Sequence, residues 1–123
     1  MSVLYVFIGG GLGALCRYAF GLWIPKAGNG FPLPTFMANF VSCIVLGLLM
    51  AYFMNSNDSS KYQLLLVTGF CGGFSTFSSF SAESYELLQS GNYSVALLYL
   101  ALSFVLCLIA IVLGIKIFGL FSH

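Results

Sequence analysis

Four long apolar stretches dominate the sequence, over residues 3–24, 34–54, 62–88 and 95–118. Each is long enough to cross the hydrocarbon core of a bilayer, because a membrane-spanning helix needs about 20 apolar residues. Only 6% of the residues are charged, whereas about 25% is usual in soluble domains. The sequence therefore predicts an all-α membrane protein with four transmembrane helices, which form a single transmembrane domain over residues 1–123.

The distribution of positive charge leaves the orientation in the membrane open. Four spans place both termini on one side, together with the polar turn at residues 55–61. Lys61 and Lys116 lie on that side, whereas Lys26 lies on the other and Arg17 sits in the first stretch near the Lys26 end. Lys and Arg normally mark the cytoplasmic side. A count of two against one, or two against two, is so weak that insertion in both orientations becomes a hypothesis.

Glycine is concentrated in the first stretch, where Gly9 and Gly13 form a GxxxG pair. Small residues at this spacing let helix backbones approach closely in lipid. The pattern predicts close packing rather than a functional site.

The third stretch departs from a plain lipid-facing helix. Gly69, Gly72 and Gly73 lie near its middle, where glycine weakens a helix and can free backbone carbonyls. Broken helix at membrane depth is tolerated only where protein or a cavity covers it. Freed carbonyls are also natural ligands for cations. We expect this helix to be broken near residues 72–76.

Phenylalanine recurs at every third position after these glycines, at Phe74, Phe77 and Phe80. This spacing places the rings on one helical face. The first interpretation is aromatic packing, with the neighbouring hydroxyls bonded back to the preceding turn. The second is a polar path, which is favoured by the five serines and threonines between residues 75 and 81.

The second stretch contains Thr35 and Asn39, one helical turn apart and therefore on one face. An amide inside the membrane is costly unless it has a partner. Asn39 either bonds to a neighbouring helix and holds the bundle together, or acts as a hydrogen-bond donor in a pore.

Acidic residues are absent from the deep parts of the apolar stretches. Proton-coupled transport usually depends on an ionisable group inside the membrane, and cation pores use acidic side chains. Hydroxyls, an amide and the partly positive edges of aromatic rings instead suit a small anion. Such dipoles hold an ion weakly enough for it to leave again.

The residue types that carry catalysis or metal binding are sparse. Cys16, Cys43, Cys71 and Cys107 fall one in each stretch, without a CxxC pair. We expect them to be reduced thiols that act as small apolar fillers. The only histidine, His123, is terminal, so no nucleophile and base pair can be built around it. We expect no enzymatic activity, and the few charges leave no basic surface for nucleic acid.

Three motifs span most of the chain: GGGLGALCRY at residues 9–18, TFMAN at 35–39 and GFCGGFSTFSSFSAE at 69–83. In this order and spacing they resemble the Fluc, or CrcB-type, fluoride channel family. The third motif is close to a family signature and is highly specific. It departs from the signature at one point, since two threonines are common where this chain has Ser75 and Thr76.

The resemblance implies a passive fluoride-selective channel that exports fluoride without ATP or proton coupling and so lowers its toxicity in the cytoplasm. It also implies a homodimer of two oppositely oriented subunits, surrounded by lipid, in the inner (plasma) membrane of a bacterium, with two pores along the subunit interface. One alternative is a small four-helix proton-coupled multidrug-type exporter, against which the first stretch argues because it has no carboxylate. The other is a membrane assembly subunit that transports nothing.

Site residues follow from the same resemblance. Phe77 and Phe80 match the phenylalanines whose ring edges contact fluoride, and Asn39 matches the pore asparagine. Tyr99 matches a tyrosine that orients the phenylalanines, and Ser103 a serine one turn further on. The complete expected pore set is Thr35, Asn39, Phe77, Ser78, Ser79, Phe80, Tyr99 and Ser103.

A structural Na⁺ is also implied, held at the dimer centre by the backbone carbonyls of Gly72 and Ser75 from each subunit. Because the ligand is a backbone carbonyl, Ser75 serves as well as a threonine. Arg17 closes the first motif, and it either snorkels to the membrane interface or lies at the pore mouth. Glu83 falls within the signature without an assigned role.

Overall fold

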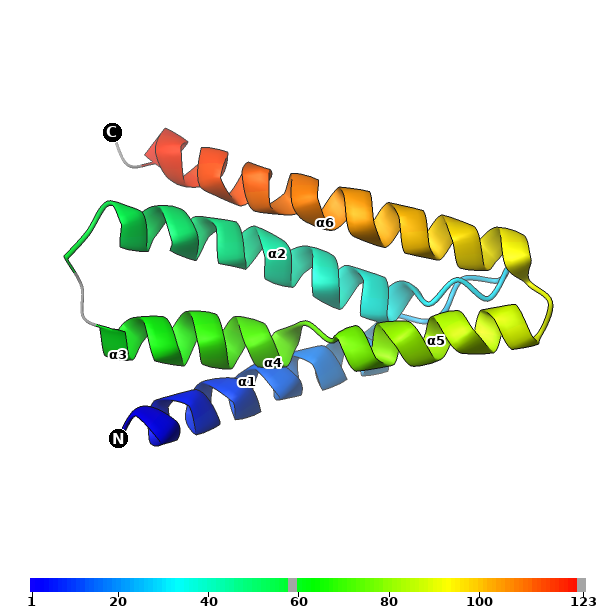
Figure 1. Ribbon diagram of the computed structural model, residues 1–123, viewed down its shortest axis with the longest axis horizontal. Coiled ribbons are helices and arrows are strands. Elements are labelled where there is room, and N and C mark those ends of the chain that lie inside the picture. The colour runs from blue at the N-terminus through cyan, green and yellow to red at the C-terminus, as the bar shows by residue number, and fades with distance from the viewer. Residues whose placement is uncertain (58–59, 122–123) are drawn as a thin grey trace.

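The computed structural model describes residues 1–57 and 60–121, which form helices joined by short connections (Figure 1). Part of the predicted turn at residues 55–61 therefore lies outside the described residues, and so does His123. The elements in chain order are α1 (Ser2–Trp23), α2 (Leu33–Met54), α3 (Ser60–Gln63), η1 (Leu64–Cys71), α4 (Gly72–Phe74), α5 (Phe77–Gln89) and α6 (Tyr93–Phe121). η1 is π-helical, and the four elements from α3 to α5 make up the third span.

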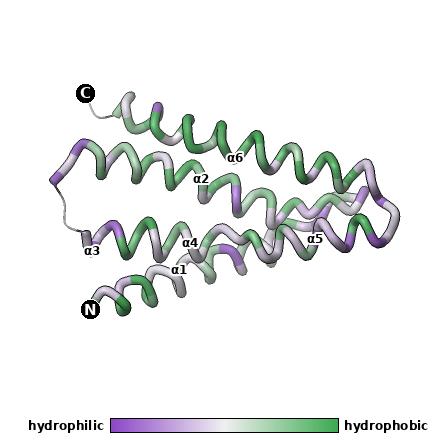
Figure 2. Tube along the Cα trace, viewed as in Figure 1, coloured by the Kyte–Doolittle hydropathy of each residue, from purple (hydrophilic) through white to green (hydrophobic). Residues whose placement is uncertain are grey.

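Among the described residues, four spans are long and apolar enough to cross a membrane, which confirms the predicted all-α fold with four transmembrane helices. They cover residues 2–23, 33–54, 60–89 and 93–121. Figure 2 shows apolar residues along most of α2 and α6. The last helix is longer than predicted, because it begins at Tyr93, soon after the positive-φ turn at Gly91, and continues to Phe121.

The start of α1 and the end of α6 lie at the same end of the molecule, as an even number of spans requires (Figure 1). The connections from α1 to α2 and from α5 to α6 lie at the other end. α2 packs against α6, while α1 packs against η1 and α4. The chain therefore consists of two helix pairs that lie side by side.

The third span is broken, as predicted, but the break is not at its glycines. Gly72 and Gly73 are helical, whereas Ser75 and Thr76 adopt extended backbone conformations. Thr76 then caps α5, because its Oγ1 accepts a hydrogen bond of 3.1 Å from the backbone N–H of Ser79. A threonine in this position satisfies one of the free N–H groups at a helix start. The new helix therefore begins at a capping residue rather than after a flexible glycine.

The glycines serve close packing instead. A side chain on Gly9 would collide with the carbonyl oxygen of Leu65, and one on Gly13 with that of Phe70. A side chain on Gly73 would likewise collide with the carbonyl oxygen of Gly10 on α1. This confirms the predicted role of the GxxxG pair, since small residues let helix backbones touch.

Candidate pore site

The side-chain amide of Asn39 on α2 forms hydrogen bonds with the backbone at the break in the third span. The backbone N–H of Thr76 donates to Asn39 Oδ1 over 2.8 Å, and Asn39 Nδ2 donates to the carbonyl of Thr76 over 3.4 Å. An unpaired backbone group at membrane depth costs several kcal/mol, so this exchange stabilises the extended segment. Of the two interpretations of Asn39, the interhelical hydrogen bond is therefore present. The amide also lines a cavity, so the pore interpretation stays open.

That cavity, the phenylalanine cavity, has a volume of about 350 Å³ and lies between α2, the break and α6. It is lined by Asn39, Cys43, Ser75, Thr76, Phe77, Phe80, Ser103, Phe104 and Cys107. Four of the expected pore residues are thus brought together from three spans. The Oγ of Ser103 is buried and has no hydrogen-bond partner among the described residues. A buried hydroxyl without a partner is unfavourable, so this atom has a free donor at the wall of the cavity.

Aromatic contacts hold Phe80 in place. Its ring lies 4.9 Å from the ring of Tyr99 and 5.8 Å from that of Phe77, measured between centroids. Tyr99 is completely buried and also contacts Phe31 edge to face at 5.3 Å. Phe77, in contrast, is 78% exposed. The Phe80 ring is therefore held by contacts within a single chain, whereas the Phe77 ring projects from the surface of that chain.

Glu83 is a functional candidate to which the sequence pattern assigned no role. Its carboxylate accepts hydrogen bonds of 3.0 Å from the hydroxyl of Tyr99 and from Thr35 Oγ1. Hydrogen bonds to an ionised acceptor are roughly twice as strong as neutral ones. The signal in the sequence was its spacing, because Glu83 lies three residues after Phe80 and so on the same face of α5. Glu83 fixes the hydroxyl end of the tyrosine whose ring supports Phe80.

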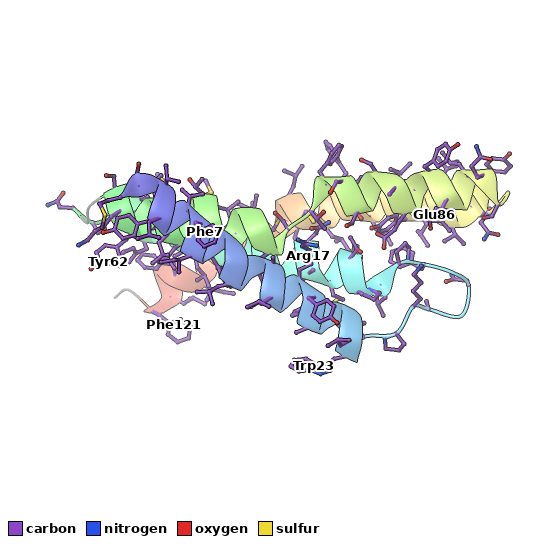
Figure 3. The ribbon with its side chains drawn as sticks, turned by 90° about the horizontal axis from the view of Figure 1, so that it is seen from below. Phe7, Arg17, Trp23, Tyr62, Glu86 and Phe121 are labelled. Atoms are coloured by element: carbon purple, nitrogen blue, oxygen red, sulfur yellow. The ribbon has the colours of Figure 1, made fainter. Side chains whose placement is uncertain are left out.

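A second cavity, the arginine cavity, has a volume of about 330 Å³ and lies on the α1 side of the break. It is lined by Arg17, Tyr18, Gly21, Leu22, Pro34, Thr35, Thr76 and Ser79. Arg17 Nε donates to the carbonyl of Gly73 over 3.1 Å, which anchors the guanidinium beside the break. Figure 3 shows the side chain between α1 and the broken span. Arg17 is therefore turned toward the inside of the bundle, while Thr35 and Ser79 belong to this cavity and not to the phenylalanine cavity.

Ser78 and Gly72 lie elsewhere, on the exposed side of the break. The hydroxyl of Ser78 pairs with Thr76 Oγ1 over 3.2 Å. Ser75 bonds through both its backbone N–H and its Oγ to the carbonyl of Cys71, and its own backbone is extended. Backbone carbonyls released by unwinding suit Na⁺. The proposed ligands Gly72 and Ser75 fit this ion chemically, but one chain offers only these two of them.

The fold and these cavities define a helical membrane protein in which a broken span lines two cavities, as in channels and transporters. A family model described as "CrcB-like protein, Camphor Resistance (CrcB)" matches residues 4–115. This chain belongs to that family.

Curated relatives are similar over most of their length. A protein of Flavobacterium psychrophilum is 42% identical over 111 residues, which cover 89% of this chain and 90% of the relative. A protein of Desulfotalea psychrophila is 40% identical over 93% of this chain and 89% of its own. One of Ignicoccus hospitalis is 40% identical over 92% of this chain and 91% of its own. All three are named "Fluoride-specific ion channel FluC".

Proposed function

We propose that this protein is a fluoride-selective ion channel, which lets fluoride leave the cytoplasm down its gradient and so lowers fluoride toxicity. The observation that carries the proposal is the phenylalanine cavity, in which Asn39, Phe77, Phe80 and Ser103 meet. Relatives named as fluoride channels support it, because they are about 40% identical over nearly the whole chain. A passive path needs no catalytic residue, and we assign none.

Selection in the phenylalanine cavity rests on weak donors rather than on charge. A fluoride ion must exchange its water for other donors, which here are the amide of Asn39, the free hydroxyl of Ser103 and the ring edges of Phe77 and Phe80. Ring edges carry partial positive charge, and dipoles bind an ion weakly enough for it to move on. Tyr99 and Glu83 act as positioning residues, since they hold the Phe80 ring.

The arginine cavity acts as the mouth of the path. A half-buried guanidinium with hydroxyls around it raises the local concentration of anions. Thr76 lines both cavities and therefore lies between them. Fluoride collected near Arg17, Thr35 and Ser79 reaches the rings by passing the break, along which Ser78 adds a further hydroxyl.

A second copy of the chain in the opposite orientation completes the site. Phe77, Gly72 and Ser78 are exposed at the break, and broken helix in a membrane needs a protein cover. Two copies related in this way form two paths along their interface. They also supply four carbonyls, from Gly72 and Ser75 of each subunit, for a structural Na⁺. The near balance of Lys and Arg suits dual insertion in a bacterial inner membrane.

Reporter fusions test the dual orientation. A reporter active only in the cytoplasm and one active only outside it are each fused to the C-terminus. Both are expected to give a signal in the same cells, because neither orientation is favoured by charge. Signal from one side alone would contradict the antiparallel dimer.

Fluoride efflux from liposomes tests the function. Purified protein is reconstituted in vesicles loaded with fluoride or with chloride, and release is followed with ion-selective electrodes. Rapid fluoride release, with chloride release no faster than from protein-free vesicles, is expected. Equal release of both ions would refute the proposal.

A further inference from the structure

Two cysteines from different helices meet at the wall of the phenylalanine cavity. Cys43 of α2 and Cys107 of α6 both line it. Their side chains therefore border the same space between the two helices. Both residues are half-buried, so the cavity gives access to them. From the sequence we expected the cysteines to be apolar fillers, because no CxxC spacing is present. Cys43 and Cys107 are distant in the sequence, and only the fold brings them together.

The backbone contact between α2 and α6 sets this pair in place. The two helices run in the same direction (Figure 1), and a side chain on Gly47 would collide with the carbonyl oxygen of Ile111. Gly114 touches α2 in the same way. Cys43 and Cys107 lie one helical turn before Gly47 and Ile111 respectively. Helices at such close approach place the two cysteines at the same level of the bundle.

We propose that Cys43 and Cys107 form a two-thiolate site for a soft monovalent metal ion of the Ag⁺ and Cu⁺ class, and that the bound ion closes the cavity to anion movement. Thiolates select soft metals over hard ones. Among the described residues no third histidine, cysteine or carboxylate joins the pair, which suits ions that accept two ligands. Metal–sulfur bonds replace the thiol protons, which pass to water. No electron is transferred.

Closure of the path rests on the proposed function, because it requires the phenylalanine cavity to carry fluoride. A metal ion held beside Asn39 and Ser103 occupies space in a cavity of about 350 Å³. Because two thiolates surround one monovalent cation, the site also carries one net negative charge. This charge repels a passing anion, so conduction fails.

Binding of Ag⁺ is measured first, on purified full-length protein in buffer free of chloride and added thiols. Equilibrium dialysis with elemental analysis is expected to find one tightly bound Ag⁺ per chain in the wild type and in the matched control Cys16→Ser. Cys16 is half-buried on α1 and lines neither cavity. Cys43→Ser and Cys107→Ser are expected to bind Ag⁺ at least about tenfold more weakly, because each removes one of two thiolate ligands.

A second measurement uses the wild type alone and so does not depend on the folding of a variant. Ag⁺ is expected to protect Cys43 and Cys107 together from iodoacetamide, while Cys16 stays reactive. Protection of Cys16 equal to that of Cys43 and Cys107, or Ag⁺ binding that is unchanged in both Cys43→Ser and Cys107→Ser, would overturn the metal site.

Fluoride efflux with and without Ag⁺ tests the closure, with each variant compared with its own untreated rate. Ag⁺ is expected to slow the wild type and Cys16→Ser at least tenfold, reversibly by dithiothreitol, and to spare both other variants. Unchanged efflux from wild-type protein saturated with Ag⁺ would overturn the closure. Absence of efflux from untreated vesicles would contradict the proposed function instead, while the dialysis would still decide the metal site.

Discussion

The two cavities that meet at Thr76 have opposite chemistry. The arginine cavity combines a full positive charge with the hydroxyls of Thr35, Thr76 and Ser79. The phenylalanine cavity contains rings, thiols, one amide and the free hydroxyl of Ser103, without any charged group. A charged wall attracts anions from water, whereas a wall of dipoles lets them go again. The break in the third span thus separates capture of an anion from its selection.

The rings of the phenylalanine cavity are expected to give the largest effect. Phe80→Ala removes the ring that Tyr99 holds in the cavity wall, so fluoride efflux is expected to fall at least about 100-fold, equivalent to roughly 2.7 kcal/mol. Phe7→Ala is the matched control, because Phe7 is 75% exposed on α1 and lines neither cavity. Liposome efflux and size-exclusion chromatography measure flux and assembly. Unchanged flux in both Phe80→Ala and Phe77→Ala would refute the assignment of the rings.

Asn39 lines the phenylalanine cavity and pairs with Thr76, which lines both cavities. Asn39→Asp keeps an acceptor for the Thr76 N–H but adds negative charge, so a loss of flux of more than about tenfold is expected from anion repulsion. Asn39→Ala leaves the backbone groups unpaired, which is expected to cost about 1–3 kcal/mol of stability. Thermal unfolding in detergent distinguishes this loss of stability from the loss of flux expected for Asn39→Asp. Full flux in Asn39→Asp would place fluoride away from this amide.

Glu83 supports the phenylalanine cavity from a distance. Glu83→Gln keeps an oxygen acceptor for Tyr99 or Thr35 and is expected to retain flux within about threefold. Glu83→Ala removes both hydrogen bonds, and its flux is expected to fall about tenfold, because the Tyr99 ring loses its anchor. Fluoride efflux from liposomes is the measurement. A loss as large in Glu83→Gln as in Glu83→Ala would mean that the carboxylate charge itself is needed, so Glu83 would not act by positioning.

Arg17 is expected to give the smallest effect on flux, and one that depends on salt. Arg17→Gln removes the charge of the arginine cavity, so efflux at low ionic strength is expected to fall about threefold to tenfold. The difference from the wild type should shrink at high salt, since screening reduces attraction of anions at a distance. Efflux measured across a series of potassium sulfate concentrations tests this. A loss that is independent of salt would assign Arg17 a structural role through its bond to Gly73.

The four spans were predictable because long apolar stretches with few charges have few folds open to them. The position of the break was predictable only to within a few residues, and for a reason that proved wrong. Glycine was expected to unwind the helix, but Gly73 packs against α1 and the chain becomes extended at Ser75 and Thr76. The three-dimensional contact between Gly73 and Gly10 shows that the glycine serves close helix packing and does not unwind the helix.

Pairings between distant spans were the least predictable part of the candidate site. The bonds from Thr35 and Tyr99 to Glu83 join three spans, and no local pattern marks either of them. Thr35 was grouped with Asn39 because they share a helical face, yet the two lie in different cavities. Helical spacing in the sequence identifies which residues share one face of a helix. Which other helix contacts that face is decided by the packing of the whole chain.

The reversal potential of reconstituted membranes tests most directly whether the uncharged cavity selects fluoride. Planar bilayers containing the protein are given a fluoride gradient in one direction and an equal chloride gradient in the other. The account predicts a potential that follows the fluoride gradient alone, because ring edges, an amide and one hydroxyl replace the water of the smaller ion. A potential near zero, which means equal permeability of the two anions, would contradict it.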